Sequence, residues 1–220
     1  SGKSTLIKAA MGLLGRAGCV TRGDIYYKGK NVLDAKGESL RKMRGPEMGM
    51  IFQNTGASLC PIRNIEEQLF EAVLQHEDVT RQEIRERALD LFDKMKLADG
   101  ERILKSYPFE LSGGMNQRVG IMLAMVQKPD LLFADEPTSA LDVTVQAQVV
   151  REMMRMRELF GTGIVLVTHN IGVVEHMADK VAVMHRGKLV EFGTTEEVIH
   201  HPGNDYTKKL IGAVLCIRRE

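Results

Sequence analysis

The spacing of apolar residues changes along this chain, and each spacing predicts a different kind of element. Short apolar runs bounded by turn residues predict strands at residues 48–52, 131–135 and 164–167. Apolar residues that recur every three or four positions predict helices from Ser4 onward and at 65–74, 81–95 and 145–160. Because strands alternate with helices, we expect an α/β fold with a mixed, largely parallel sheet flanked by helices.

Turn and cap residues refine this outline. Two hairpins with glycine in the turn are expected at residues 24–33 and 181–192. Two capping boxes, each with Thr three positions before Glu, are expected at 80–83 and 194–197. In the first helix, we expect the buried face to consist of Leu6, Ala10, Leu13 and Leu14. Residues 57–126 are mainly helical in pattern, so we predict a helical subdomain inserted between two parts of one sheet.

Composition allows a real core and narrows the class of protein. The chain has 220 residues, of which 44% are hydrophobic, enough for one domain or two closely joined lobes. Lys and Arg total 30 and Asp and Glu total 29, a balance that argues against a protein whose main task is to coat nucleic acid. The three cysteines form no CxxC pair, which predicts reduced thiols and no zinc site. The apolar runs are too short to span a bilayer.

Two neighbouring motifs give the first functional signal. Leu111-Ser112-Gly113-Gly114 opens a predicted helix, whose unpaired N–H groups and dipole favour a phosphate. The strand at 131–135 ends in Asp135 and Glu136, at the edge of the sheet where α/β proteins place their chemistry. Taken alone, Ser-Gly-Gly is more often a plain loop, and many strands end in acids. The two motifs in succession favour a phosphate site.

The first residues of the chain form a third motif. Gly2-Lys3-Ser4 at a helix start is the second half of the phosphate loop GxxxxGK[ST]. In such a loop the backbone N–H groups cradle phosphates, Lys3 reaches the outer phosphates and Ser4 holds Mg²⁺. We expect the first glycine and the strand that feeds the loop to lie before Ser1, so the motif is half visible.

Two polar residues follow predicted strands. Gln53 comes after the strand at 48–52, and His169 comes after the strand at 164–167. A lone glutamine in this position is usually a solvated amide, and a lone histidine is usually structural. A functional role for either residue is inferred only together with the other motifs.

Five features therefore stand in one order, at Gly2-Lys3-Ser4, Gln53, Leu111–Gly114, Asp135–Glu136 and His169. This set resembles the nucleotide-binding subunit of ABC transporters, and residues 139–142 resemble the D-loop of that family. The resemblance covers nearly every residue from 1 to 200. It implies a P-loop NTPase fold of the ABC ATPase type with an inserted helical subdomain, and an ATPase that uses ATP and Mg²⁺.

The resemblance also divides the chain. Residues 1–56 would form the N-terminal part of the ATPase core, and residues 57–126 the helical subdomain with the LSGG motif. Residues 127–200 would form the C-terminal part of the core, and residues 201–220 the start of a C-terminal extension.

Roles follow from matching positions. The resemblance assigns phosphate contacts to Gly2, Lys3, Ser4 and Thr5, and Mg²⁺ contacts to Ser4, Gln53 and Asp135. Glu136 polarises the attacking water, His169 contacts the γ phosphate, and Gln53 contacts the metal or the water and senses the membrane partner. Further nucleotide contacts come from Ser112, Gly113, Gly114 and Asp142. This division fits phosphoryl transfer, which needs positioning, charge neutralisation and a base for the in-line water.

In this family two subunits form a head-to-tail sandwich, with each ATP between the phosphate loop of one and Ser112–Gly114 of the other. The implied partners are a second ABC ATPase subunit, usually a paralogue, transmembrane permease subunits and, indirectly, a substrate-binding protein. No nucleic acid is implied. The implied location is the cytoplasmic face of the inner membrane, as a peripheral protein.

Several stretches are similar to importers of the dipeptide, oligopeptide and nickel type, at residues 44–53, 57–63, 113–118, 138–144 and 201–210. The resemblance thus implies uptake of peptides or of nickel and metal chelates. The cargo itself is not readable, because other subunits select it.

The resemblance has one departure and two rivals. The expected absence of the first half of the phosphate loop leads us to expect that the 220-residue chain alone binds ATP poorly. One rival is a soluble ABC-type ATPase acting on nucleic acid or ribosomes. Such proteins carry a long coiled coil, a zinc hook or a tandem second cassette. Here only 57 residues separate Gln53 from Leu111, and no CxxC is present. The other rival is a non-catalytic paired subunit, against which Glu136 and His169 argue.

Overall fold

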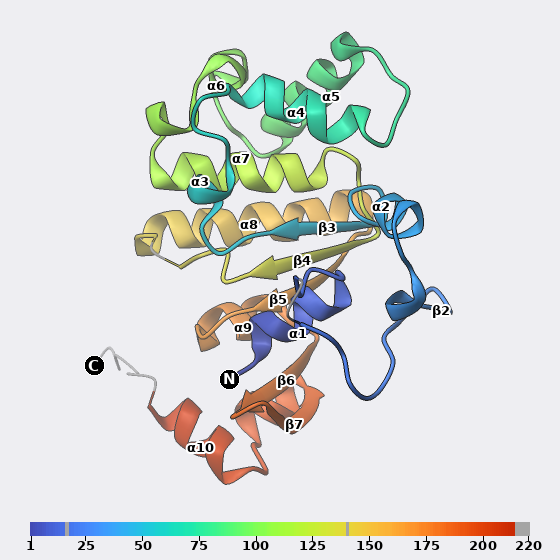
Figure 1. Cartoon of the computed structure of the whole chain (residues 1–220). Coiled ribbons are helices and arrows are strands. Elements are labelled where there is room, and N and C mark those ends of the chain that lie inside the picture. The colour runs from blue at the N-terminus through green and yellow to red at the C-terminus, as the bar shows by residue number, and fades with distance from the viewer. Residues whose placement is uncertain (16–17, 140, 214–220) are drawn as a thin grey trace, which may run out of the picture.

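A three-stranded parallel sheet lies at the centre of the protein, seen in a computed structural model that describes residues 1–15, 18–139 and 141–213. The strands are β3 (Met48–Ile51), β4 (Leu131–Asp135) and β5 (Gly163–Val167), in that order across the sheet (Figure 1). Ile51 pairs with Ala134, and Asp135 pairs with Val167. The carboxyl ends of all three strands therefore meet at one edge.

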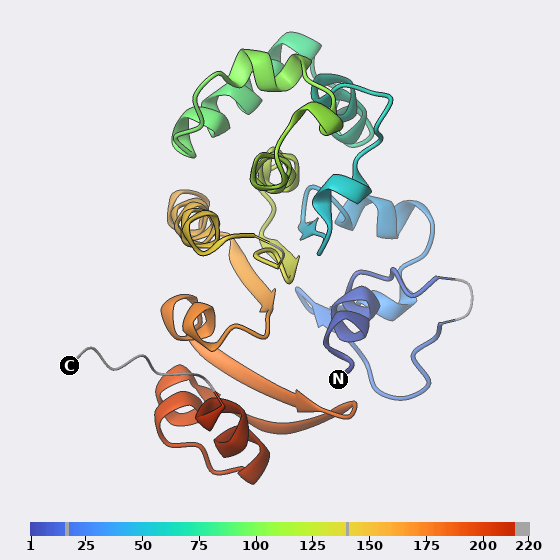
Figure 2. The same cartoon turned by 90° about the vertical axis from the view of Figure 1, so that its left-hand side faces the viewer.

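Side chains of the sheet alternate between two apolar clusters, as the pleat of a strand requires. Phe133 packs with Ile7 of α1 (Lys3–Ala10) and with Met11, which directly follows that helix. Leu132 and Ala134 belong to the larger cluster, which includes α7 (Gly113–Met125) and α8 (Val143–Phe160). Figure 2 shows α1 and α8 on opposite faces of the sheet. This confirms the expected α/β class with helices on both sides.

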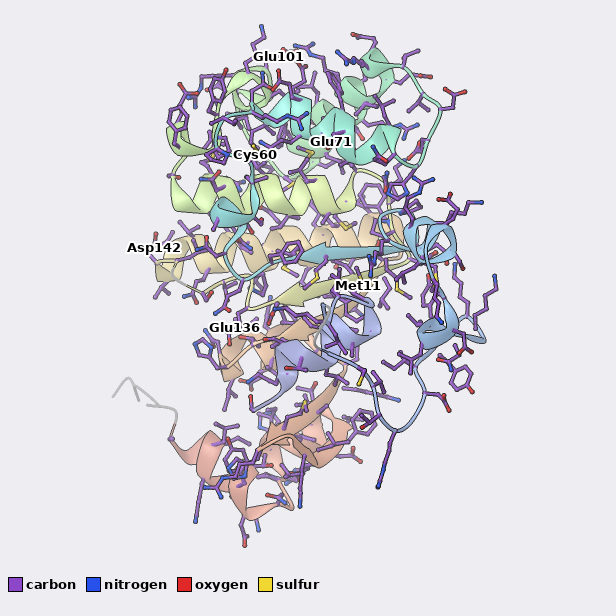
Figure 3. The ribbon with its side chains drawn as sticks, in the orientation of Figure 1. Met11, Cys60, Glu71, Glu101, Glu136 and Asp142 are labelled. Atoms are coloured by element: carbon purple, nitrogen blue, oxygen red, sulfur yellow. The ribbon has the colours of Figure 1, made fainter. Side chains whose placement is uncertain are left out.

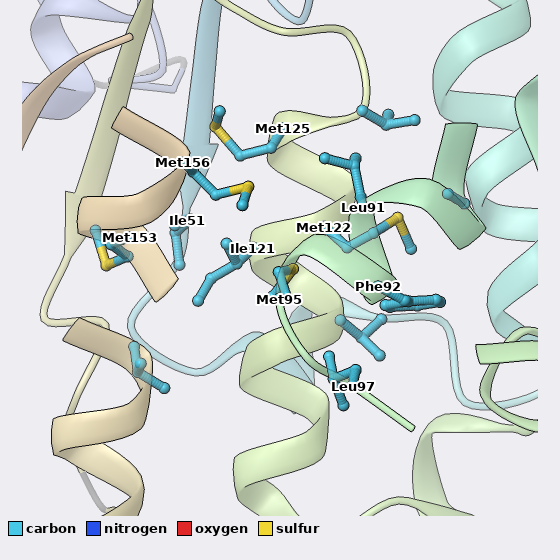
Figure 4. Close-up of a cluster of buried hydrophobic side chains, with 14 of the residues drawn as sticks. Ile51, Leu91, Phe92, Met95, Leu97, Ile121, Met122, Met125, Met153 and Met156 are labelled. Atoms are coloured by element: carbon cyan, nitrogen blue, oxygen red, sulfur yellow. The ribbon is translucent and has the colours of Figure 1, made fainter. Parts of the chain in front are cut away.

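The remaining helices of the chain's middle part gather at one end of the molecule (Figure 1). They are α3 (Thr55–Ser58), α4 (Ile65–Leu74), α5 (Arg81–Lys94) and α6 (Gly100–Lys105). Their shared core with α7 and α8 is rich in methionine, as Figure 4 shows. Methionine fills irregular gaps between helices, and Met122, Met125 and Met153 are fully buried.

Two local predictions are confirmed in detail. The helix expected at 65–74 is α4 with the same bounds. Thr80 and Glu83 form the predicted capping box at the start of α5: the Thr80 hydroxyl accepts from the Glu83 N–H, and the Glu83 carboxylate accepts from the Thr80 N–H. The equivalent bonds join Thr194 and Glu197, before a single π-helical turn at Glu196–His200.

The expected buried face of the first helix is wrong at Leu6, whereas Ala10 and Leu13 are partly buried against the cluster that contains Phe133. Leu6 is 55% exposed, whereas Ile7 and Met11 are buried. Because Gly12 adopts a φ of +65° and its N–H bonds back to Ala9, the helix ends at Ala10. Leu13 and Leu14 thus lie beyond the helix, and the spacing that included them described no helical face.

Both predicted hairpins are present as antiparallel ribbons with two-residue turns. Strands β1 (Tyr26–Tyr27) and β2 (Lys30–Asn31) flank Lys28 and Gly29, and strands β6 (Lys180–His185) and β7 (Lys188–Thr194) flank Arg186 and Gly187. All four turn residues have positive φ, the conformation that matches strand twist. The other elements are η1 (Val32–Asp34), α2 (Glu38–Met43), η2 (Pro108–Glu110), α9 (Ile171–Met177) and α10 (Asp205–Gly212).

Some expectations fall on residues that the structure does not describe. Ala140 of the predicted D-loop, Cys216, and residues 214–220 of the predicted C-terminal extension lie outside the described ranges. Cys19 and Cys60 are free. Among the described residues, no helix has both the length and the apolar character needed to cross a bilayer.

Candidate functional site

The shared edge of the parallel sheet brings together the polar residues that follow its strands. Gln53 lies two positions after β3, Glu136 lies directly after β4, and His169 lies two positions after β5. Figure 3 shows Glu136 at the end of β4. Because the strands are parallel and in register, residues more than a hundred positions apart reach one place.

Ser4 and Asp135 form the first contact of this site. The Ser4 hydroxyl donates to Asp135 Oδ1 at 2.9 Å, which joins the first turn of α1 to the tip of β4. Asp135 is only 4% exposed. A hydroxyl and a carboxylate side by side are hard oxygen donors, the type that Mg²⁺ takes from proteins alongside substrate phosphates and water. These residues therefore fit the predicted metal role.

Glu136 forms the second contact and lies between two partners. Gln53 Nε2 donates to Glu136 Oε2 at 3.2 Å, and His169 Nδ1 lies 3.3 Å from Glu136 Oε1. The Glu136 side chain is 21% exposed, against 71% for His169. The carboxylate is therefore held in place while its histidine neighbour faces outward.

The backbone at Glu136 is strained. Its φ is +47°, and its N–H donates to the Val167 carbonyl at 2.8 Å. The left-handed region costs a residue with a side chain about 1–2 kcal/mol. Strain of this kind is commonly kept where a side chain must be aimed at a site, which is consistent with a functional role for Glu136.

The start of α1 is open to a ligand. Gly2 has a φ of +91° and no side chain caps the helix, so the first N–H groups have no partner within the helix. Lys3 Nζ reaches Ser1 Oγ at 3.0 Å. The β6–β7 turn supports this loop, because Gly187 N–H donates to the Ser1 carbonyl at 3.1 Å. Sequence reasoning found that turn but missed its contact with the loop.

The start of α7 lies against the start of α8, away from those contacts. Ser112 caps α7 by accepting from the Met115 N–H, and Asp142 caps α8 by accepting from the Val145 N–H. A Cβ on Gly114 would lie 2.8 Å from Val145 Cγ1, whereas one on Gly113 would meet nothing within 4 Å. Gly114 is thus packed and Gly113 is open.

An ion pair joins the same two helices further along. Arg118 of α7 contacts Glu152 of α8, and both side chains are largely buried. Burial raises the pKa of the Glu152 carboxyl, and the hydrogen bond from Arg118 opposes that rise. This pair fixes α7 relative to α8.

The predicted site residues therefore fall into two groups. One group is gathered at the sheet edge: Ser4, Gln53, Asp135, Glu136 and His169, with Gly2, Lys3 and Thr5 beside Ser4 at the start of α1. The other group is Ser112, Gly113, Gly114 and Asp142. Within residues 1–15, 18–139 and 141–213, no hydrogen bond or ion pair joins the two groups. Thr5 is exposed in the first turn of α1, and the described residues contain no cluster of three or more His, Cys, Asp or Glu that would hold a metal alone.

The starts of α1 and α7 both lack acidic residues. The first turns of α1 and α7 contain no Asp or Glu, whereas those of α4 and α5 do. A carboxylate there would stabilise the helix dipole but repel a phosphate. Neither first turn therefore carries a charge that would repel a phosphate, a feature that α3, α8 and α9 share.

Comparison with known proteins places this site in a family. A sequence profile described as "ABC transporter" matches residues 1–139. The chain belongs to the ABC transporter family. Its membership agrees with the resemblance drawn from the five motifs.

Three proteins with sequences similar to this ABC transporter chain are named as peptide transport ATP-binding proteins. The probable D,D-dipeptide transport ATP-binding protein DdpD of Escherichia coli is 43% identical over 98% of this chain and 65% of its own length. The dipeptide transport ATP-binding protein DppD of Lactococcus lactis is 41% identical over 97% and 62%. The oligopeptide transport ATP-binding protein OppD of Bacillus subtilis is 39% identical over 97% and 60%. The chain thus spans less than two thirds of these relatives.

Solved structures agree with the fold. A dimeric bacterial ABC transporter cassette matches with a TM-score of 0.74 and 26% identity, over 88% of this chain and 81% of that one. A dimeric ATP-binding cassette in a post-hydrolysis state, bound to ADP and phosphate, matches with a TM-score of 0.73 over the same shares. The ABC ATPase fold class, with its parallel sheet and added helices, is therefore confirmed.

Proposed function

We propose that this chain is the ATP-hydrolysing part of an ABC importer. The observation that carries the proposal is the position of Glu136, held between Gln53 and His169 beside the Ser4–Asp135 contact. Glu136 would accept a proton from the attacking water, and Asp135 would help to bind the metal. That pairing suits hydrolysis of a phosphate anhydride.

The proposed roles follow from what each side chain touches. Lys3 and the N–H groups at the start of α1, with Gly2 and Thr5, would bind the phosphates. Ser4, Asp135 and Gln53 would hold Mg²⁺, which when bound supplies charge neutralisation for the phosphates. Glu136 would accept the proton of the attacking water, and the exposed His169 would contact the γ phosphate.

The site would be completed by the matching residues of a partner subunit. Ser112, Gly113, Gly114 and Asp142 make no described contact with the first group of their own chain, so we propose that they face the nucleotide of a partner subunit. One similar structure is a dimeric cassette bound to ADP and phosphate, which supports a sandwich with nucleotide in the interface. We propose a paralogue as partner, and the division of the chain at residues 56, 126 and 200.

We propose peptides as the cargo. The printed names of the relatives are dipeptide, D,D-dipeptide and oligopeptide transport ATP-binding proteins, which supports a peptide over a nickel complex. Uptake would require permease subunits and a substrate-binding protein, with this chain as a peripheral protein on the cytoplasmic face of the inner membrane.

A groove beside the site offers a place for the permease. It has a volume of about 480 Å³, and its lining combines apolar residues of β3 and α7 with polar residues of α3 such as Thr55 and Ser58. Phe52, directly before Gln53, lines it and is 43% exposed. A permease segment bound in this groove would touch Phe52, and the next residue, Gln53, contacts Glu136.

Replacement of Glu136 tests the proposal. In the full-length protein, we expect Glu136→Gln to lower the rate of ATP hydrolysis roughly 10²- to 10⁴-fold, the usual contribution of a positioned base, while nucleotide still binds. Glu158→Gln, on the exposed face of α8, is the matched control and should leave the rate unchanged. Hydrolysis that is unaffected by Glu136→Gln would remove Glu136 from this role.

A further inference from the structure

The segment that carries Gln53 is tied to α7 by a buried polar contact. Thr55 begins α3 and is 5% exposed. Its Oγ1 lies 2.8 Å from Gln117 Oε1 and 3.2 Å from the Phe52 carbonyl oxygen. Gln117 lies in α7 and is also 5% exposed. Buried polar side chains cost stability unless they are paired. The contact between Thr55 and Gln117 therefore stabilises the fold.

The hydroxyl of Thr55 has one proton and two acceptors within reach. A half-turn of the Gln117 amide exchanges its oxygen and nitrogen, and Nε2 then donates to Thr55 Oγ1. The Thr55 hydroxyl can then donate to the Phe52 carbonyl, so both of its contacts are satisfied. The same half-turn gives a partner to Gln117 Nε2, which otherwise is buried without one, and it moves Oε1 to the position that Nε2 leaves. The bonds now run from α7 to the backbone one residue before Gln53.

The fit around Thr55 is tight. A Cβ on Gly120 of α7 would lie 2.2 Å from Thr55 Cγ2. Glycine inside a helix costs about 0.5–1 kcal/mol relative to alanine. The Thr55 methyl group occupies the space that an alanine side chain would need, which gives a structural reason for this glycine.

The same turn of α7 also holds the segment before Ser112. Asn116 Nδ2 donates to the Pro108 carbonyl at 2.9 Å and to the Leu111 carbonyl at 3.3 Å. Asn116 and Gln117 are neighbours, so adjacent residues of one helix fix the start of α7 and the backbone beside Gln53.

We propose that Thr55 and Gln117 are positioning residues that set the distance between Gln53 and Glu136 according to the placement of α7. The proposal rests on the proposed ATPase function for its kinetic consequence. Neither residue touches the site itself. They act through the Phe52 carbonyl, and a shift of α7 would move Gln53 relative to the Glu136 carboxylate.

Two substitutions would remove the contact between Thr55 and Gln117, called the anchor below, with little change in the shape of the side chain. Thr55→Val keeps the branched side chain without the hydroxyl, and Gln117→Leu keeps the approximate size without the amide. In the full-length protein, each should lower kcat for ATP hydrolysis about tenfold, the worth of one hydrogen bond, without changing KM for ATP. Thr55→Ser keeps the hydroxyl and should restore the rate. Ser58→Ala is the matched control, since Ser58 Oγ donates only to the Thr55 carbonyl within α3.

Hydrogen exchange gives a readout that needs no turnover. Backbone amides of residues 52–58 should exchange faster in Thr55→Val and Gln117→Leu than in the wild type, without nucleotide, and Thr55→Ser should not differ. In a Gln53→Ala background, Thr55→Val should cause no further loss of rate. Equal losses in Thr55→Val and Thr55→Ser, or a full tenfold loss in the Gln53→Ala background, would overturn the proposal. A wild type without ATPase activity would instead overturn the proposed function, while the exchange rates would still test the anchor.

Discussion

Two helix starts in this molecule are suited to phosphate, and they are built differently. The start of α1 has Gly2 in the left-handed region and no capping side chain. The start of α7 is capped by the Ser112 hydroxyl. Both lack acids in the first turn. One end thus leaves its first N–H groups to a ligand, whereas at the other end the Ser112 hydroxyl satisfies one of them, the N–H of Met115.

The difference indicates two kinds of work. Because α1 lacks a cap, bound phosphate would stabilise it, so binding and local order are linked there. Because α7 is capped and Gly114 packs on Val145, its end is a fixed surface that offers the open Gly113. In the proposed sandwich, α1 would grip the nucleotide and α7 of the partner would close over it.

Of the changes at these helix starts, the largest expected effect on nucleotide binding is at α1. Lys3→Ala in the full-length protein should weaken ATP binding roughly 30- to 150-fold, since a hydrogen bond to a charged group is worth about 2–3 kcal/mol. Lys8→Ala, on the exposed side of the same helix, should bind ATP like the wild type. Calorimetric titration measures both. Equal weakening in the two variants would show that only net charge matters and that α1 does not grip phosphate.

At α7 the adjacent glycines give a matched pair. Gly114→Ala should lower the free energy of unfolding by about 1–3 kcal/mol, because its Cβ would overlap Val145 Cγ1. Gly113→Ala should not destabilise the protein, because nothing lies within 4 Å of its Cβ. Denaturant unfolding distinguishes the two. If Val145→Ala does not relieve the Gly114→Ala loss, the clash is not its cause.

The cap of α7 separates stability from function. Ser112→Ala should lower the free energy of unfolding by about 1 kcal/mol, the usual worth of an N-cap. Ser112→Asp should keep that stability, since Asp is an equally good cap, but should abolish stimulated hydrolysis because its charge would repel the γ phosphate of the partner. Thermal unfolding and ATPase assays on the same samples check this. An active Ser112→Asp protein would contradict the proposed role of this helix start.

The smallest effect concerns α5, whose start is capped by a carboxylate. Hydrogen bonds from the Thr80 backbone N–H, and then from its hydroxyl, lower the pKa of Glu83 below its usual range. The stabilisation is therefore present at neutral pH and is lost as pH falls through that lowered pKa. Wild type and Glu83→Gln should differ in unfolding free energy at neutral pH and converge in acid. A difference between wild type and Glu83→Gln that stays the same in acid would show that the carboxylate is not its source.

Local sequence signals predicted much of this molecule. The bounds of α4, the capping box of Thr80 and both hairpin turns depend on residues close together in sequence. The resemblance carried by the order of motifs also predicted that Ser4, Gln53, Asp135 and His169 belong to one site, and the parallel strands explain why they meet. The contacts that make the site work were harder to predict.

The failures share a physical cause, since each depends on what packs from elsewhere. The exposed Leu6 was misassigned because Gly12 ends α1 before the apolar spacing ends. The contact of Gly114 with Val145, and that of Thr55 with Gln117, join segments whose approach no local pattern encodes. Close approach of backbones is decided by tertiary packing, and a glycine in the sequence shows only that it is permitted.

The hydrogen bond between Gly187 and Ser1 has a consequence for the birth of the chain. It joins the phosphate loop to a turn made of much later residues, and the Ser4 partner Asp135 is also made late. On the ribosome, residues 1–4 are synthesised before Asp135 and Gly187, so this loop waits for most of the described chain before its supports exist. Nucleotide binding would therefore come late in folding, and a protein cut short after β5 would lose the contact between Gly187 and Ser1.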